Sequence, residues 1–467
     1  MERFFSDALG WGYFMTSDSS SSTIAAISTP MGKGAIGIIR LSGNDSITIA
    51  SQLFKLSPTR VKPRHVYFNK IELTTHVILD HVLFFYLKAP HSYTGEDMIE
   101  ISCHANPIIL NELLTHIISL GATLAPPGEF TKRAFLNGKM DLTEAEAVAT
   151  LIESKSLGSV YLSTRQLEGK FSKTIQAMKQ MVVTIVRDYN ACIEFEETDH
   201  LVIDISTTLK TLINLKSNIV QIIQNFSHHR YVYEGAKVVI TGKTNVGKSS
   251  LFNALITKEK SIVTPYHGTT RDLIESTIHI GQFPITLIDT AGTRKSSNRV
   301  EQIGIKRTKE ALRDADLILF VVNSKTSLSP SELSHYEEIK TKSHVIVMNK
   351  VDLPHVKLRS PFKSVVKTST KNGQGIDALK KKIVSALSSR LSNIDTDMMT
   401  LNTRHIDLLK KTDHALHTAI TLAKTKKEPE LIVATLNDAI RYFSEITGEI
   451  TTDEILNSIF DTFCVGK

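Results

Sequence analysis

The octapeptide at residues 242–249 restricts the fold of this chain more than any other feature. Its sequence, GKTNVGKS, fits the phosphate-binding pattern G-x-x-x-x-G-K-[ST]. The glycines let backbone N–H groups turn toward phosphate oxygens, Lys248 can reach the β- and γ-phosphates, and the Ser249 hydroxyl can bind magnesium. Residues 236–240, apolar apart from Lys237, predict a buried strand before the loop, and residues 249–255 predict a helix after it. This order predicts an α/β domain of the P-loop GTPase or ATPase type.

Further polar segments follow apolar strands in the order of a guanine-nucleotide site. The predicted strand at 285–288, apolar apart from Thr286, runs into Asp289, and the apolar residues 345–348 run into Asn349. The Asp352 carboxylate can accept from N1–H and the 2-amino group of guanine, which adenine lacks, so GTP is the expected nucleotide. Thr270, in the polar loop 268–272, can complete the magnesium shell with Ser249. The predicted nucleotide-binding residues are Asn245, Val246, Gly247, Lys248, Ser249, Ser250, Thr264, Thr269, Thr270, Asp289, Thr290, Ala291, Gly292, Asn349, Lys350, Asp352, Ser369 and Thr370.

A Ras-like GTPase would carry glutamine directly after the segment Asp-Thr-Ala-Gly, where it orients the attacking water. In this chain Thr293 follows Gly292. We therefore expect the water to be oriented by another group.

Composition sets outer limits on the class of protein. At 467 residues, with 41% hydrophobic and 22% charged residues, the chain is expected to form a soluble globular protein of roughly three domains. No apolar run is long enough to span a bilayer, so no membrane association is expected. Cys103, Cys192 and Cys464 are too few and too scattered for a disulfide framework, which favours the reducing cytoplasm. The net charge of +7 suits a polyanion such as RNA.

The predicted GTPase domain, residues 234–388, lies in the middle of the chain. Residues 1–22 are Ser-rich and are expected to be a disordered extension, and residues 23–139 show strand-like alternation. Residues 140–233 and 389–467 show helical periodicity, with apolar stripes such as Ile406, Leu409, Leu416, Ile420 and Ala423. Neither flank alone looks like a complete helical bundle. We therefore expect one helical domain whose two halves pack together. Two independent helical caps are the alternative.

These segments together resemble the MnmE (TrmE) family of tRNA uridine-34 modification GTPases. The resemblance covers the chain from about residue 23 and rests on five segments. They are GAIGIIRLSG at 34–43, YTGED at 93–97, residues 128–141 beginning GEF, the central GTPase motifs, and the terminal FCVGK at 463–467. The fold class it implies is a multidomain α/β and α+β protein. It would have an N-terminal folate-binding α+β domain, an all-α helical domain and an inserted Ras-like P-loop GTPase domain.

The resemblance implies a tetrahydrofolate site in the N-terminal domain. The matching positions are Arg40, Glu100 and Lys139, with the terminal Lys467 nearby, and the ligand would be a 5-formyl or 5,10-methylene derivative. Judged singly, each of these charges is more typical of a solvated surface. Cys464 has two interpretations, a small buried residue or a thiol close to the folate. At residues 103–106 the chain has CHAN where relatives usually carry a Gly-rich string.

The resemblance also implies how this GTPase is activated. A potassium ion would lie beside the phosphates, in the place of an arginine finger. Its ligands would match Asn245, Thr264, Tyr266 and Thr269. Glu301, which on its own would be an exposed acid at a helix start, matches the carboxylate that orients water. The family acts as a homodimer and, with a flavin-dependent MnmG-type partner forming a heterotetramer, modifies C5 of the tRNA wobble uridine.

Two other functions fit part of the sequence. A ribosome-assembly GTPase with RNA-binding flanks would bind no folate, but the sequence has no G-x-x-G loop in the context of a KH domain. A folate-dependent one-carbon enzyme regulated by its GTPase domain would turn over without GTP. The inserted GTPase domain and the Cys-x-Gly-Lys terminus favour tRNA modification over both.

Overall fold

The computed structural model describes most of the chain, which forms two compact units. One contains residues 1–149 and 447–467, and the other contains residues 150–446. The described residues are 22–74, 77–154, 156–194, 204–233, 235–257, 274–280, 283–289, 308–325, 328–353, 362, 364–391, 401–425 and 427–467. The predicted extension, residues 1–22, lies outside them apart from Ser22.

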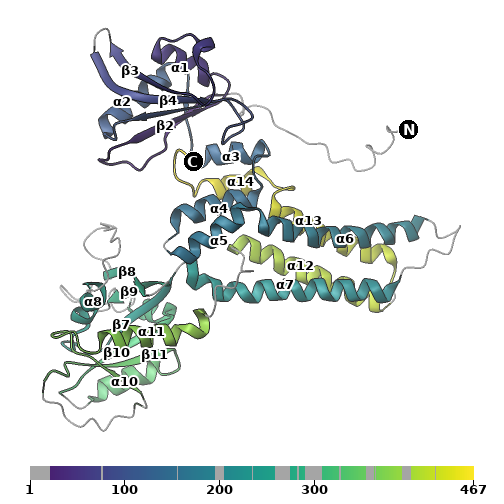
Figure 1. Ribbon diagram of the computed structural model, residues 1–467. Coiled ribbons are helices and arrows are strands. Elements are labelled where there is room, and N and C mark those ends of the chain that lie inside the picture. The colour runs from purple at the N-terminus through teal and green to yellow at the C-terminus, as the bar shows by residue number, and fades with distance from the viewer. Residues whose placement is uncertain are drawn as a thin grey trace. The chain divides into compact units, whose positions relative to one another are not determined.

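The first unit is built on a six-stranded sheet with the order β3-β4-β5-β2-β1-β6 (Figure 1). Neighbouring strands are antiparallel except β1 and β6, which are parallel. The strands are β1 (Ile24–Ile27), β2 (Gly37–Ser42), β3 (Val66–Thr74), β4 (Val77–Leu87), β5 (Met98–Cys103) and β6 (Thr123–Leu124). Apolar residues alternate along β2 and β5, so these central strands bury one set of side chains and aim the other at the opposite face.

Helices cover this sheet through two separate apolar clusters. Helices α1 (Ser46–Phe54) and α2 (Pro107–Ser119) pack on the face that buries Ile39, Leu41 and Phe84. Near the other face, Phe130 of α3 (Glu129–Leu136) packs with Ile24 and Met98. The remaining elements of this unit are the short helix η1 (Pro58–Arg60) and α14 (Asp453–Phe460). Helix α4 (Leu142–Glu153) crosses the division between the two units.

Four long helices of the second unit share one apolar core. They are α6 (Lys170–Glu194), α7 (Ile205–Tyr233), α12 (Thr403–Lys424) and α13 (Pro429–Thr447). The stripe predicted on α12 is buried, with Leu409 and Leu416 fully enclosed. Helix α5 (Leu157–Leu167) precedes them. Segments on both sides of the central GTPase sequence therefore bury their apolar faces against one another.

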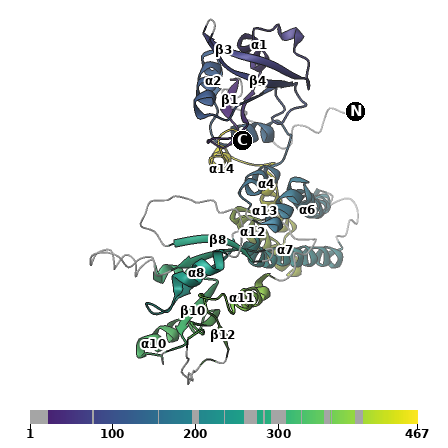
Figure 2. The same cartoon turned by 60° about the vertical axis from the view of Figure 1, so that its left-hand side comes forward.

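The central sequence forms a second six-stranded sheet, ordered β12-β11-β10-β7-β9-β8 (Figure 2). All neighbouring pairs are parallel except β8 and β9. The strands are β7 (Ala236–Thr241), β8 (Ile274–Ile280), β9 (Phe283–Asp289), β10 (Leu317–Asn323), β11 (His344–Asn349) and β12 (Val365–Lys367). Helices α8 (Lys248–Thr257) and α11 (Ile376–Leu391) share one core with the sheet, and α10 (Pro330–Ile339) belongs to another. This is the doubly wound P-loop architecture that the sequence predicted.

Candidate functional site

The phosphate loop between β7 and α8 has a shape that only glycine permits at two positions. Gly242 has φ 145°, and a Cβ there would lie 2.3 Å from the Val321 carbonyl oxygen. Gly247 has φ 97°, and its Cβ would lie 2.3 Å from Asn349 Nδ2. Asn245 also has a positive φ, of 63°, which asparagine tolerates better than most residues. The loop therefore packs its backbone directly against the ends of β10 and β11.

Lys248 is held against this loop rather than pointing into solvent. The residue is only 7% exposed. Its ammonium donates to the carbonyl oxygens of Gly242 at 2.9 Å and Lys243 at 2.7 Å. A buried ammonium beside a loop of backbone N–H groups is suited to neutralise phosphate charge.

The predicted magnesium-binding hydroxyl lies against a buried carboxylate. Ser249 Oγ donates to Asp289 Oδ2 at 2.7 Å, and Asp289 is fully buried at the end of β9. The parallel register of β7 and β9 pairs Ile240 with Asp289, which brings that strand end beside the phosphate loop. Hydroxyl and carboxylate oxygens are the ligands that Mg²⁺ prefers, so these residues fit that ion. Ser250 follows in the first turn of α8 with an exposed side chain.

The end of β11 is tied to the phosphate loop by two side chains. Asn349 is fully buried and donates from Nδ2 to the Val246 carbonyl at 3.0 Å. Lys350, with φ 66°, donates from Nζ to the Asn245 carbonyl at 2.7 Å. Thr368, which the sequence analysis missed, is buried and donates to Asn349 Oδ1 at 3.4 Å. The segment 349–352, which ends at the predicted base reader, is thus tied through Asn349 and Lys350 to the loop that would hold the phosphates.

The predicted base reader, Asp352, is oriented by a serine from the next strand end. Ser369 Oγ donates to Asp352 Oδ1 at 2.7 Å. This hydrogen bond lowers the pKa of Asp352, and the positive charges of Lys371 and Lys325 lower it further. The carboxylate therefore stays ionised, as an acceptor for two guanine N–H groups must be. Thr370 follows Ser369 directly and is half-buried.

Several predicted residues lie outside the described part of the chain. They are Thr264, Tyr266, Thr269, Thr270, Thr290, Ala291, Gly292 and Glu301. The described residues bring together Asn245, Val246 and Gly247 with Asn349 and Lys350. They also pair Ser249 with Asp289, and Asp352 with Ser369.

A second polar site lies on the first sheet, at the register pair Arg40 and Glu100 of β2 and β5. The Nε and NH2 groups of Arg40 both lie 2.7 Å from Glu100 Oε1. Each side chain is 16% exposed, so the pair is largely shielded yet reachable from solvent. The Arg40 guanidinium lies 5.7 Å from the Tyr93 ring centroid and 5.9 Å from that of Phe130, at cation–π range.

The C-terminal residues join this second site. Arg40 NH1 donates to the Gly466 carbonyl oxygen at 3.3 Å. Burial lowers the pKa of Lys467, the nearby positive charge of Arg40 lowers it further, and Glu100 acts in the opposite direction. Arg40, Glu100 and Lys467 are therefore brought together. Lys139 is exposed and donates instead to the Pro90 carbonyl at 3.0 Å.

Buried ionic contacts beside this site involve residues of the segment YTGED. Arg133 of α3, with its side chain 5% exposed, lies 3.1 Å from Glu96 and 3.0 Å from Glu129. Ser42 at the end of β2 donates to Glu96 at 2.7 Å and lies 2.6 Å from the Thr94 hydroxyl. Removing one partner of such a buried pair is strongly destabilising. This network therefore fixes α3 against the strand that carries Arg40.

The atypical CHAN segment forms a well-bonded turn between β5 and α2. Asp80 Oδ2 accepts from the His104 backbone at 2.8 Å, and Asp80 Oδ1 contacts the His104 ring at 2.8 Å. Burial raises the pKa of Asp80, but the hydrogen bonds from His104 and His81 outweigh burial and lower it. The Asn106 side chain accepts from Ile108 N at 2.9 Å and caps α2. These side chains stabilise the loop that joins β5 to α2.

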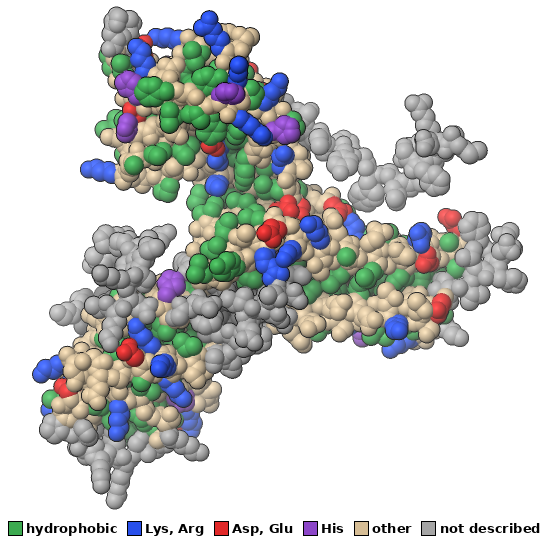
Figure 3. Space-filling model, viewed as in Figure 1, with side chains coloured by type: hydrophobic (Ala, Val, Ile, Leu, Met, Phe, Trp, Pro, Cys, Tyr) green, Lys and Arg blue, Asp and Glu red, His purple; other side chains and the backbone are tan. Residues whose placement is uncertain are grey.

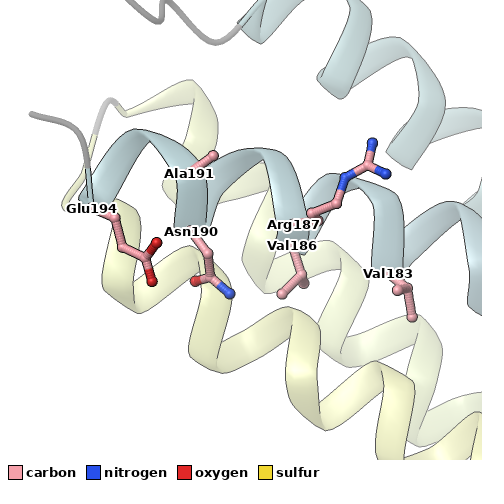
Figure 4. Close-up of a pocket in the computed structure, with 6 residues that line it drawn as sticks. All are labelled: Val183, Val186, Arg187, Asn190, Ala191 and Glu194. Carbon is pink, nitrogen blue, oxygen red and sulfur yellow. The ribbon is translucent and has the colours of Figure 1, made fainter. Parts of the chain in front are cut away.

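A shallow pocket also lies along α6 (Figure 4). Its lining residues are Val183, Val186, Arg187, Asn190, Ala191 and Glu194. None of the predicted nucleotide or folate residues belongs to it. Within the part of the chain that the structure describes, no helix is long and apolar enough to cross a bilayer.

Comparisons with known proteins match both flanks of the chain. The family model "GTP-binding protein TrmE N-terminus" matches residues 23–139, and the "MnmE helical domain" model matches residues 142–464. The tRNA modification GTPase MnmE of Aquifex aeolicus is 41% identical over 95% of this chain and 99% of its own length. The protein of the same name from Koribacter versatilis is 37% identical over 95% of this chain and 99% of its own.

Proposed function

Because the chain belongs to the MnmE family of tRNA modification GTPases, we propose that it uses a folate one-carbon unit to modify C5 of the wobble uridine, U34, in certain tRNAs. The observation that carries the folate part is the shielded Arg40–Glu100 pair with Lys467 beside it. A carboxylate can accept from the donor edge of a pterin ring, and cations suit the glutamate tail. The bound tetrahydrofolate derivative, 5-formyl or 5,10-methylene, would supply the one-carbon unit.

The GTPase site would open and close the assembly in step with the nucleotide state. Ser249 and Asp289 would hold Mg²⁺, joined according to the family resemblance by Thr270. The resemblance assigns Glu301 to the attacking water, which would compensate for the missing glutamine after Gly292. In this proposal two GTPase domains of a homodimer meet, and their contact positions Glu301 for hydrolysis.

Two partners complete the proposal. The net charge of +7 favours tRNA, and that affinity should fall with salt. Two flavin-dependent MnmG-type subunits would form a heterotetramer with the homodimer in the cytoplasm. Exposed apolar side chains on β3 and β4 offer a surface for association (Figure 3), with Phe68 72%, Val66 66% and Leu83 46% exposed.

We expect GTP turnover to be faster in potassium than in sodium at equal ionic strength. The ion would be held by Asn245, Thr264, Tyr266 and Thr269, and Asn245→Ala should abolish the difference. Asn245→Gly tests the ligand separately from the backbone, because glycine accepts the φ of 63° while also removing the side-chain oxygen. Both variants should lose the salt preference. Equal turnover of the parent protein in the two salts would contradict a potassium site.

We expect the protein to bind 5-formyltetrahydrofolate, and Arg40→Ala or Glu100→Ala to weaken binding about 10- to 150-fold. This range corresponds to one lost charged hydrogen bond of roughly 1.5–3 kcal/mol. Isothermal titration calorimetry measures the change. Arg60→Ala and Glu112→Ala are matched controls, because both residues are exposed in the same unit. No heat and no competition with a formyl-folate would remove the folate assignment.

The proposed cellular function is tested by mass spectrometry of tRNA nucleosides. A bacterial strain lacking its own family member should regain the C5-modified wobble uridine when it carries this gene and a compatible flavin-dependent partner. If the modification stays absent although the protein hydrolyses GTP and the native partner is co-expressed, the U34 assignment is wrong. A GTPase of ribosome assembly would then be the next candidate.

A further inference from the structure

The C-terminal tail packs against the first sheet and against the N-terminus of α3. Phe460 and Phe463 are 2% and 7% exposed, with ring centroids 5.3 Å apart. At the N-terminus of α3, a Cβ on Gly128 would lie 2.5 Å from the Phe460 carbonyl oxygen. The backbone turns again at the end, where Lys467 N donates to Cys464 O at 3.3 Å.

Gly466 occupies a place that no other residue could occupy without a shift of the backbone. Its φ is 88°, in the region that favours glycine. A Cβ at this position would lie 2.5 Å from the Ile27 carbonyl oxygen and 2.8 Å from Ser28 Cα. The tail backbone therefore lies directly against the end of β1.

Two side chains hold the Gly466 carbonyl from the sheet. Ser28 Oγ donates to it at 3.1 Å, and Arg40 NH1 donates at 3.3 Å. The other edge of the same guanidinium, formed by Nε and NH2, contacts the Glu100 carboxylate. Arg40 is thus fixed at one end by the tail and at the other by the carboxylate expected to contact the ligand.

We propose that the tail is a latch whose Gly466 carbonyl positions Arg40 in the folate site, and that Ser28 is a positioning residue of this latch. This inference rests on the proposed folate function. Ser28 would not contact the folate itself. It would hold the Gly466 carbonyl, and that carbonyl would hold Arg40 against Glu100. When the tail is seated, Lys467 lies close to Arg40 and Glu100. The lowered pKa of Lys467, caused by burial and by Arg40, agrees with a seated tail.

Carboxypeptidase B, which removes a C-terminal lysine, reports the seating of the tail without any folate. Removal of Lys467 requires the tail to leave the sheet, so its rate follows the population of the open form. The variants are Ser28→Ala, Ser28→Thr and Gly466→Ala, with Val465→Ala as control because Val465 is 49% exposed. Mass spectrometry of the full chain follows the loss of lysine.

We expect Ser28→Ala to speed the release of Lys467 about fivefold, equivalent to one neutral hydrogen bond of roughly 1 kcal/mol. Gly466→Ala should speed it more than tenfold, about the effect of a strained φ added to a backbone clash. Ser28→Thr should restore the parent rate because it keeps the hydroxyl, and Val465→Ala should match the parent. Affinity for 5-formyltetrahydrofolate should fall in the same order.

The possible results distinguish a failure of the latch from a failure of the proposed folate function. Equal lysine release from the parent, Ser28→Ala and Gly466→Ala would show that the tail is not seated. Faster release with unchanged folate affinity would overturn the latch and leave the folate site standing. A parent that protects Lys467 but binds no folate would refute the folate function, and the latch role in it, while the tail contacts remain.

Discussion

Asp352→Asn should turn a GTP-binding protein into one that prefers xanthosine triphosphate. The parent carboxylate would accept from N1–H and the 2-amino group of guanine, whereas the amide of the variant would offer a donor to the 2-oxo group of xanthine. Losing two charged hydrogen bonds of roughly 1.5–3 kcal/mol each predicts a fall in GTP affinity of about 10²- to 10⁴-fold. The fold should survive, because an asparagine oxygen can still accept from Ser369, which lies 2.7 Å from Asp352 Oδ1.

Competition binding of the two nucleotides measures this change. Asp314→Asn is the matched control, since Asp314 is an exposed acid of the same domain whose side chain is 54% exposed. The lowered pKa of Asp352 adds a pH expectation. A depressed pKa keeps the carboxylate charged above that pKa, so guanine preference should persist as pH falls through the ordinary range of aspartate. An Asn variant that binds both nucleotides as the parent does would show that Asp352 does not read the base.

Lys248→Ala should reduce GTP hydrolysis about 10²- to 10³-fold, the usual result of losing one preorganised donor to a developing charge. Affinity for GTP should fall as well, because the ammonium would contact the bound phosphates already in the ground state. The variant Glu301→Ala separates GTP binding from GTP hydrolysis. It should leave GTP affinity near normal while single-turnover hydrolysis falls about 10²-fold, since Glu301 would act only on the attacking water. Unchanged hydrolysis by Glu301→Ala would remove that residue from the mechanism.

The arrangement of the candidate nucleotide site was predictable because its determinants are local. Each predicted segment follows an apolar run, and parallel strands carry their ends to one edge of the sheet. Asp289, Asn349 and Ser369 accordingly lie at or just beyond the ends of β9, β11 and β12. The buried Thr368 was missed because a threonine beside Ser369 has no signal of its own in a strand-end sequence.

The second site was less predictable because it depends on register and on a distant part of the chain. Nothing local in the sequence says that Arg40 stands opposite Glu100, a pairing that antiparallel register alone creates. Tyr93, Phe130 and Ser28 were missed for the same reason. Lys139, placed with the folate residues by resemblance, donates to Pro90 here. The predicted potassium loop and Glu301 lie outside the described residues and stay predictions.

The transfer of a folate carbon to U34 is tested most directly by isotope tracing in a purified system. The full-length protein, a flavin-dependent partner of the family, unmodified tRNA, GTP and 5,10-methylenetetrahydrofolate labelled with ¹³C at the methylene carbon would be incubated in potassium salt. Mass spectrometry of the digested tRNA should show a C5-modified wobble uridine that carries the label, and Lys248→Ala should form far less of it. A modified uridine without label, or label incorporated equally well without GTP, would contradict the account.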